Sequence, residues 1–437
     1  MATAVEHRYW DRAAECMPRP ELARLQAELL RKAVAYAYDR VPYYRQLLQE
    51  AKVSPEQVRS PDDLRRLPFT TKETLAEHYP FGMLAVPLDE VVRIHASSGT
   101  TGNPKIVPYT KGDLERWSDL VARIAVAAGV RRNDIAQIAF GYGLFTGGFG
   151  LHYGLEKVGA MVIPSSSGNT RRQIKLMREL GTTVLVSTPS YAIYIGETLA
   201  ELGIAPEELQ LRLGMFGGER TTEQMRAAIE ELLGITATDN YGLSELSGPG
   251  VSGECLERNG LHIWEDHFIV EVIDPETGET MPPGAEGELT FTTLQREAMP
   301  MLRYRTGDLA RLIPEPCACG RTHIRMTPVH ARTDDMLIIR GVNVYPSQIE
   351  AVLREIEGTS PHYQIVVDRR RTLEQVELLV EVDERIFHDR MRELHRLEEQ
   401  IKHGLYTALG INIKVSLVEP RTLARSEGGK SIRIIER

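Results

Sequence analysis

The segment from Ser97 to Lys105 has the composition of an anion-binding loop. It reads Ser-Ser-Gly-Thr-Thr-Gly-Asn-Pro-Lys, so four hydroxyl residues and two glycines fill six positions and a lysine follows three residues later. Glycines allow backbone N–H groups to converge on an anion, hydroxyls add donors and the lysine adds positive charge. The alternating residues 90–96 before it and residues 106–109 after it indicate short strands. The pattern predicts a polyphosphate loop between two strands.

This loop differs from a P-loop. The G-x-x-x-x-G-K-[ST] spacing is absent from it, and no helix follows directly. The segment Gly428-Gly429-Lys430-Ser431 also fails the pattern, because Ala424 stands where the first glycine would be. Taken alone, the loop has a flexible polar hairpin turn as its alternative interpretation.

A second candidate segment, 141–150, combines five glycines with three aromatic residues. Glycines let the backbone approach a ligand closely, and aromatic rings supply flat apolar surface. The alternative is a glycine-rich turn that ends the strand at 134–140. The residues expected to line a ligand pocket are Tyr142, Phe145, Gly147 and Gly148, with Gly217 from a later strand end.

Two further polar segments, 217–219 and 240–245, follow consecutive predicted strands. They read Gly-Gly-Glu and Asn-Tyr-Gly-Leu-Ser-Glu. In parallel sheets, ligands bind beyond the carboxyl ends of the strands. Tyr241 offers a ring that can stack on a base, and Glu245 offers a hard oxygen ligand for Mg²⁺.

Alternating strands and helices carry these segments. The predicted helices are 111–128, 170–180, 189–202 and 222–233, and the predicted strands are 134–140, 161–164, 183–187, 211–216 and 236–240. This alternation implies a parallel sheet with helices on both faces. Residues 20–40 form an amphipathic helix before it, and Pro42 is expected to break that helix. From residue 263, short strands at 267–274, 287–292 and 309–313 indicate a small antiparallel β subdomain.

Length and composition limit the function classes. The 437 residues suggest two or three domains, and 42% hydrophobic residues with 26% charged residues are typical of a globular protein. A net charge of −9 disfavours nonspecific binding to nucleic acid or an anionic membrane. No apolar run approaches the roughly 18 residues of a membrane span, and residues 1–12 lack a secretory signal. Four cysteines argue against a disulfide scaffold, so we expect a cytoplasmic protein.

The order of these motifs resembles the acyl-adenylate-forming superfamily. In that family the Ser97 loop holds phosphates, the Tyr241 segment holds adenine and Mg²⁺, and a Tyr-x-Thr-Gly-Asp pattern, here ending at Asp308, supplies a carboxylate to the ribose. From its residue type alone, Asp308 would be an ordinary turn residue. Residues 331–350 resemble the family's hinge and the start of its C-terminal domain, although Ala331 stands where the family usually has glycine.

The finer resemblance is to phenylacetate–coenzyme A ligases. It rests on residues 140–148, 263–268, 332–344 and 425–431. The implied reaction has two steps, in which ATP activates an aryl acid to an acyl-adenylate and coenzyme A then takes the acyl group. The resemblance implies ATP, Mg²⁺ and coenzyme A as cofactors or cosubstrates and a homodimer as the assembly. Carrier-protein loading, activation of a benzoate-type or other aryl acid, and a non-catalytic nucleotide-binding homologue remain alternatives.

The resemblance assigns roles residue by residue. Lys430, Thr100 and Glu245 are the implied catalytic residues, and Asp334 is the implied hinge. The pocket of the 141–150 segment is the implied acyl pocket. The implied nucleotide and coenzyme A residues are Ser97, Ser98, Gly99, Thr101, Gly102, Lys105, Gly217, Gly218, Glu219, Asn240, Tyr241, Gly242, Ser244, Asp308, Arg332 and Gly341. The expected architecture is α/β. Residues 1–333 form a large domain of mixed or parallel sheets flanked by helices, with its β subdomain at about 250–333, and residues 334–437 form a small mobile α+β domain.

Three cysteines suggest a metal that this reaction does not require. Cys317 and Cys319 form a short knuckle-like loop, and Cys255 precedes His262 by seven residues. If the intervening strands form hairpins, three thiolates and one imidazole can enclose a structural zinc ion. His323 competes with His262 as fourth ligand, and the alternative is three reduced cysteines in surface loops.

Overall fold

The computed structural model describes residues 8–97, 105–333, 337–339, 342–344, 346–368, 375–383, 391–409, 412–423 and 434–436. The chain divides into two compact units, one formed by residues up to Pro328 and one that begins at Val329. None of the helices in the described ranges combines the length and apolar character that crossing a membrane requires.

One continuous sheet organises the first unit. Its strands follow the order β10-β11-β12-β13-β9-β8-β7-β6-β5-β3-β4. Their bounds are β3 (Ile135–Ile138), β4 (Met161–Ile163), β5 (Val184–Ser187), β6 (Leu213–Gly217), β7 (Thr236–Leu243), β8 (Gly248–Glu254), β9 (Leu261–Ile263), β10 (Phe268–Ile273), β11 (Glu286–Thr293), β12 (Tyr304–Ile313) and β13 (Arg325–Met326). Neighbouring strands from β4 to β7 pair in parallel, and those from β7 onward pair antiparallel. The strands expected to form a β subdomain are therefore joined to the parallel strands edge to edge.

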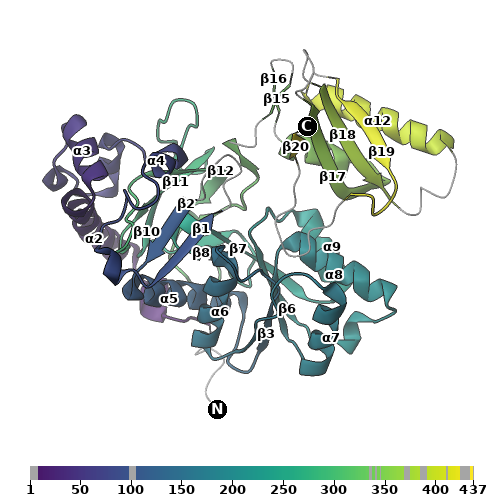
Figure 1. Cartoon of the computed structure of the whole chain (residues 1–437), viewed down its shortest axis with the longest axis horizontal. Coiled ribbons are helices and arrows are strands. Elements are labelled where there is room, and N and C mark those ends of the chain that lie inside the picture. The colour runs from purple at the N-terminus through teal and green to yellow at the C-terminus, as the bar shows by residue number, and fades with distance from the viewer. Residues whose placement is uncertain are drawn as a thin grey trace. The chain divides into compact units, whose positions relative to one another are not determined.

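Helices cover both faces of the parallel part. Figure 1 shows α5 and α6 on one face and α7 to α9 on the other. Their bounds are α5 (Lys111–Ala128), α6 (Thr146–Val158), α7 (Thr170–Leu180), α8 (Pro189–Glu201) and α9 (Glu223–Leu233). A core of buried side chains, including Ile195, Phe216 and Ile229, joins the second group of helices to the sheet. This arrangement confirms the predicted α/β class.

Capping residues explain where these helices begin and end. Thr110 accepts a hydrogen bond from the Asp113 backbone N–H at the start of α5, and Gly129 ends the helix at φ +98°. Asn169 and Gly181 do the same for α7.

The lead-in is helical. It contains α1 (Arg12–Glu15), α2 (Arg19–Arg40), α3 (Pro42–Glu50) and α4 (Lys72–Glu77). Pro42, expected only to break a helix, is the first residue of α3, where proline's missing N–H costs nothing. The antiparallel hairpin of β1 (Arg93–Ser97) and β2 (Lys105–Tyr109) follows, and it pairs Ser97 with Lys105.

The second unit has its own small core. Strands β17 (Thr359–Asp368), β18 (Gln375–Val382), β19 (Lys414–Val418) and β20 (Ile434–Glu436) form a sheet of order β19-β18-β17-β20. The remaining elements are β14 (Ala331–Arg332), the hairpin of β15 (Leu337–Ile339) and β16 (Val342–Val344), and helices α10 (Pro346–Arg354) and α12 (Met391–Leu409). Ile349, Ile365, Leu378 and Ile401 are among its buried residues. Strands and packed helices match the expected α+β composition.

Candidate active site

The β1–β2 hairpin presents the two ends of the predicted phosphate loop. Ser97 and Lys105 are register partners, so the segment between them starts and finishes at one place. The Lys105 Nζ lies 3.4 Å from Oε1 of Glu245, and both side chains are largely buried. The hairpin therefore brings its lysine to the carboxylate that the sequence assigns to Mg²⁺.

A hydroxyl contact joins the nucleotide motif to the predicted acyl segment. Ser244 and Glu245 lie in the short 3-10 turn after β7, and both are buried. The Ser244 Oγ is 3.1 Å from Oγ1 of Thr146, the first residue of α6. The Tyr109 hydroxyl also donates to the Ser244 carbonyl at 3.3 Å. The 240–245 segment and the 141–150 segment thus meet directly.

Tyr241 and Asp308 come together although 67 residues separate them. The Tyr241 hydroxyl donates to Oδ2 of Asp308 at 2.7 Å. Asp308 is buried and lies within strand β12, so its interpretation as a turn residue is wrong. Its N–H donates to Oγ1 of Thr306 at 3.0 Å, which fixes the backbone beside the carboxylate. The proposed adenine and ribose residues are therefore in direct contact.

The ends of β6 and β7 pack tightly against one another. A Cβ on Gly217 would lie 2.5 Å from the Asn240 carbonyl oxygen, so strand packing by itself requires this glycine. The Asn240 amide donates to the Phe216 carbonyl at 2.6 Å. Gly218 differs, since a Cβ there would meet nothing closer than 3.7 Å and its φ is +78°. At Gly218 it is therefore the left-handed backbone, and not close packing, that favours glycine.

Two other predicted residues of this region have structural partners. The Ser190 hydroxyl donates to Oε2 of Glu219 at 2.6 Å, which ties the β6 end to α8. A Cβ on Gly242 would lie 1.8 Å from the Gly248 carbonyl oxygen, so only glycine fits where β7 meets β8.

A buried ion pair supports β7 beneath the site. Arg226 of α9 binds Glu254 through two contacts of 2.9 Å, and the backbone N–H of Asp239 donates to the same carboxylate at 2.8 Å. Burial, followed by repulsion from Glu254, raises the pKa of Asp239 well above its usual range. The Glu254 carboxylate thus connects strand β7, which carries Asn240 to Leu243, to helix α9.

The predicted acyl residues lie at the start of α6. Gly147 and Gly148 are buried in its first turn, whereas Phe145, its N-cap residue, is 37% exposed. A Cβ on Gly147 would lie 2.5 Å from the Phe145 ring, and one on Gly148 would lie 2.8 Å from the Gly141 carbonyl oxygen. These glycines therefore let the 141–145 loop lie directly on the helix.

Tyr142 belongs to an aromatic cluster on the same helix. Its ring meets Phe149 edge to face at 5.3 Å, and its hydroxyl is 3.1 Å from Nδ1 of His152. Burial is the main cause that raises the pKa of Tyr142 above its usual value. The phenol therefore stays neutral at physiological pH and can only exchange hydrogen bonds.

His95 is a candidate that sequence patterning missed. It lies in β1 between the rings of Tyr109, Trp117 and Phe149, at centroid distances of 5.4 to 5.7 Å. Its Nδ1 is 3.1 Å from the Leu144 carbonyl oxygen, and its buried Nε2 has no partner among the described residues. Burial lowers its pKa, so the ring is neutral. Its position two residues before Ser97 was the only available signal.

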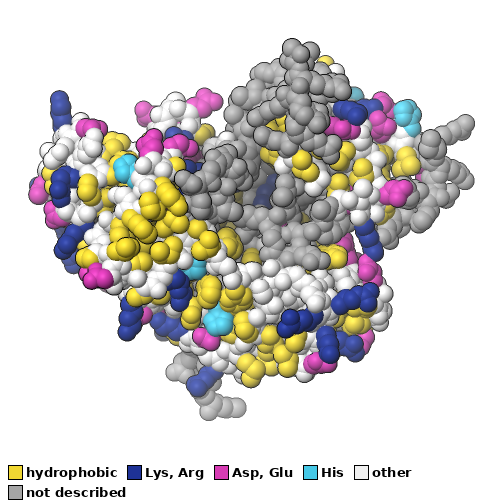
Figure 2. Space-filling view, viewed as in Figure 1, with side chains coloured by type: hydrophobic (Ala, Val, Ile, Leu, Met, Phe, Trp, Pro, Cys, Tyr) yellow, Lys and Arg dark blue, Asp and Glu magenta, His cyan; other side chains and the backbone are white. Residues whose placement is uncertain are grey.

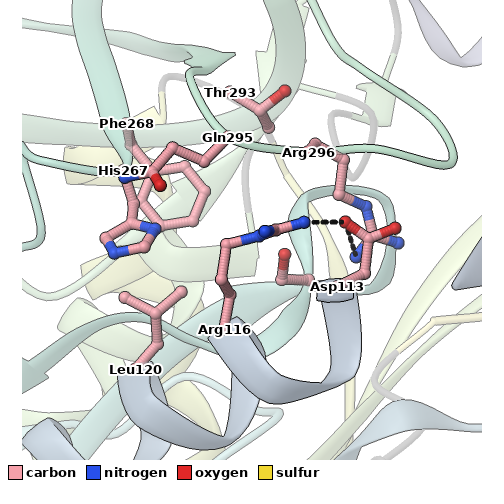
Figure 3. Close-up of a pocket in the computed structure, with 9 residues that line it drawn as sticks. Asp113, Arg116, Leu120, His267, Phe268, Thr293, Gln295 and Arg296 are labelled. Carbon is pink, nitrogen blue, oxygen red and sulfur yellow. Dashed lines mark hydrogen bonds and ion pairs between the residues drawn. The ribbon is translucent and has the colours of Figure 1, made fainter. Parts of the chain in front are cut away.

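A small polar cavity lies away from these motifs. Figure 3 shows it between α5 and the loop that follows β11, with Asp113, Arg116 and His267 among its lining residues. Its volume of about 20 Å³ holds no more than about one water. It is too small for a substrate.

The four predicted zinc ligands converge. One ligand atom from each of Cys255, His262, Cys317 and Cys319 lies within 4.8 Å of all the others. His323 is placed elsewhere, with Nδ1 accepting from the Glu265 N–H at 2.8 Å and Nε2 lying 2.9 Å from the Ala14 carbonyl oxygen. Of the two histidines, only His262 belongs to this group.

Eight of the predicted site residues lie outside the part of the chain that the structure describes. Those outside the described residues are Ser98, Gly99, Thr100, Thr101, Gly102, Asp334, Gly341 and Lys430. Arg332 ends β14 in the second unit and is half-buried.

The fold and these motifs define an adenylate-binding class of protein. Residues 15–295 match the family model for AMP-binding enzymes, and residues 341–437 match the model for the C-terminal domain of AMP-binding enzymes. The chain therefore belongs to the AMP-binding enzyme family, which confirms the predicted superfamily.

Two curated relatives and one solved structure show which members of this family the chain is similar to. The chain is 52% identical to a phenylacetate–coenzyme A ligase of Thermus thermophilus over 97% of its own length and 98% of the relative. It is 46% identical to the phenylacetate–coenzyme A ligase of Escherichia coli, with 95% of each covered. Among solved structures, a 2-hydroxyisobutyryl–coenzyme A ligase in the postadenylation state, in complex with R3-HIB-AMP, matches with a TM-score of 0.91 and 29% identity, covering 100% of this chain and 94% of that one. The predicted resemblance to phenylacetate–coenzyme A ligases is thus confirmed.

Proposed function

We propose that this protein is an AMP-forming acid–thiol ligase that converts phenylacetate, ATP and coenzyme A to phenylacetyl-coenzyme A, AMP and pyrophosphate. The observation that carries the proposal is the 3.1 Å contact between Thr146 and Ser244, because it joins the acyl segment to the nucleotide motif. A carboxylate held by the first segment would face an α-phosphate held by the second. The similarity to curated phenylacetate–coenzyme A ligases supports the choice of acid.

In the first step, a carboxylate oxygen attacks the α-phosphorus, and the bond from that phosphorus to pyrophosphate breaks. A carboxylic acid is ionised at neutral pH, so no side chain has to remove a proton. Lys430 would neutralise charge that develops on the carboxylate and α-phosphate oxygens. Thr100 and Thr101, with the amides of their loop, would hold the outgoing phosphates.

The site suits a nucleotide and Mg²⁺ in composition. Glu245 is buried with Lys105 as a near neighbour at 3.4 Å, a pairing of carboxylate and cation that fits a metal–polyphosphate complex. Mg²⁺ bound there would neutralise phosphate charge. Asp308 offers its remaining acceptor capacity to the ribose hydroxyls, and Arg332 is its proposed partner in that role.

In the second step, the coenzyme A thiol loses its proton to solvent, its sulfur forms a bond to the acyl carbon, the anhydride C–O bond breaks, and AMP leaves. We place the hinge between two domains, 1–333 and 334–437, at Asp334. Rotation there would withdraw Lys430 and bring Gly341 to the thiol. A hinge of a few residues is sufficient for such a motion.

Exchange of radiolabel between pyrophosphate and ATP tests the first step, and consumption of free coenzyme A tests the second. The proposed function requires phenylacetate-dependent exchange and one thioester for each AMP. Exchange without coenzyme A consumption would favour a carrier-protein loader. Absence of exchange would identify a binding protein without this chemistry.

We also propose a cytoplasmic homodimer. All four cysteines are free, as is usual for a reducing compartment. Figure 2 shows hydrophobic side chains gathered over the β1–β2 hairpin, and the exposed apolar residues next to and within it include Leu88, Val92 and Ile94. Exposed apolar surface of this kind is typical of protein interfaces. A monomeric mass by light scattering at micromolar concentration would contradict the dimer.

A further inference from the structure

A compact group of three sulfurs and one imidazole lies where β8 ends and the antiparallel strand β9 pairs with it. The Cys255 and Cys317 sulfurs are 3.7 Å apart, and the Cys319 sulfur is 3.4 Å from Nε2 of His262. In a tetrahedral site with Zn–S bonds of about 2.3 Å, neighbouring sulfurs lie about 3.7–3.8 Å apart. These two distances match those of a zinc site, and all four ligand atoms lie within 4.8 Å of one another.

Strand pairing produces this convergence. Cys255 directly follows β8, and His262 lies in β9, which pairs back on β8. Cys317 and Cys319 lie in the loop between β12 and β13, and β13 places Arg325 opposite His262. Arg325 is fully buried and donates to the carbonyls of Asn259 and Glu315, one from each of the two loops. Arg325 thus links the loop that carries Cys255 to the loop that carries Cys317 and Cys319.

The surroundings suit a closed structural site. His262, Cys255 and Cys319 are each at most 4% exposed, and Ala127 of α5 packs against the sulfurs. The Arg321 backbone N–H points at the Cys319 sulfur at 3.5 Å, a contact that stabilises thiolates. Among the described residues, no aspartate or glutamate belongs to the group. Enclosure and the N/S ligand set favour zinc over Mg²⁺ or Ca²⁺.

We propose that Cys255, His262, Cys317 and Cys319 bind one Zn²⁺ ion in a closed, structural Cys₃His site. Binding ionises the thiols, so their protons leave to solvent as three Zn–S bonds form, and Nε2 of His262 completes the tetrahedron. With all four positions occupied by protein, no position remains for a catalytic water.

The contacts of the Cys317–Thr322 loop indicate what the metal stabilises. The Tyr9 hydroxyl donates to the Cys319 carbonyl at 2.7 Å, and the buried Arg321 contacts Glu15 at 2.7 Å. Thr322 donates through its hydroxyl to the Met17 carbonyl at 2.6 Å. The knuckle loop therefore anchors residues 9–17, and the zinc ion joins this lead-in to the sheet.

Metal analysis of the full-length protein, purified without a metal-affinity tag, tests the proposal. We expect about one zinc per chain, and a loss of at least about half of it in Cys255→Ser and in Cys317→Ser. Cys16→Ser is the matched control, because Cys16 is a free thiol outside the group. It should retain the metal content of the parent protein.

A second measurement covers variants that fail to fold. Replacement of the bound metal in the parent protein by Co²⁺ should give thiolate-to-cobalt charge transfer and the strong visible absorption of tetrahedral cobalt. Metal removal should lower the melting temperature. At temperatures below the new melting point, phenylacetate-dependent ATP–pyrophosphate exchange should persist. Substoichiometric zinc in the parent, octahedral cobalt spectra, or a mass lower by two hydrogens from a Cys255–Cys317 disulfide would overturn the site.

Discussion

The Tyr241 hydroxyl donates a 2.7 Å hydrogen bond to the buried Asp308 carboxylate. This bond connects the end of β7 with the middle of β12, so the residues proposed for adenine and ribose are oriented together. The Tyr241 ring also stacks on the Phe291 ring, with 6.3 Å between the ring centroids, and this contact helps to fix the orientation of Tyr241.

Tyr241→Phe should weaken ATP binding and leave the chemical step almost unchanged. The variant keeps the ring but loses the bond that orients Asp308, a loss of roughly 1 kcal/mol, or about fivefold in KM for ATP. Steady-state kinetics with saturating acid measure it. A large fall in kcat with an unchanged KM would contradict the proposed role of this pair.

Lys430→Ala and Asp334→Pro should separate the two half-reactions. Loss of Lys430 should reduce adenylation by about 10²-fold or more, yet leave thioester formation from supplied acyl-adenylate largely intact. Proline fixes φ, so Asp334→Pro should impair thioester formation and spare adenylation. Single-turnover assays of each half-reaction measure both effects. Equal losses in both halves would exclude the assigned role of Lys430, and a normal thioester step would exclude the hinge.

Gly147→Val should exclude aryl acids from the site. A Cβ there would lie 2.5 Å from the ring of Phe145, which is itself a proposed acyl-pocket residue, so the ring has to move and the pocket changes shape. We expect KM for phenylacetate to rise at least about tenfold with KM for ATP unchanged. Gly143→Ala is the matched control, since its Cβ would meet nothing within 4 Å. A comparable loss of ATP affinity would show that Gly147 does not line the acyl pocket.

The elements were more predictable than the contacts. The ranges 111–128 and 170–180 were correct because local caps and helical periodicity determine them. Nothing local indicated that Gly217 packs on Asn240, since that contact depends on the pairing of β6 with β7. Asp308 looked like a turn residue because Thr-Gly-Asp has turn composition, whereas its pairing partners keep it in a strand. His95 was missed because a single histidine in a strand is ordinarily a core residue.

His267 should make the protein less stable at acid pH. Burial lowers its pKa to about 4, against the attraction of the neighbouring Asp266, and Figure 3 shows the ring beside Leu120. Below pH 6.5 the unfolded chain binds a proton that the folded chain refuses, so stability falls until the pH reaches about 4.

Thermal unfolding of His267→Gln between pH 7.5 and 4.5 measures this contribution, which is roughly 2–3 kcal/mol at its largest. The variant should lose less stability on acidification than the parent protein. His403→Gln, an exposed position, is the control and should follow the parent. Parallel curves for all three proteins would show that His267 titrates normally.

One assay tests the central claim most directly: AMP and acyl-coenzyme A formed from a panel of aryl acids with ATP, Mg²⁺ and coenzyme A. We predict equal amounts of AMP and thioester, and the highest kcat/KM for phenylacetate among phenylacetate, hydroxyphenylacetates, benzoates and indole acetate. A preference for a benzoate would change the assigned substrate but not the assigned reaction. No acid-dependent AMP release, or AMP release without thioester from any of these acids, would contradict the assignment as a ligase.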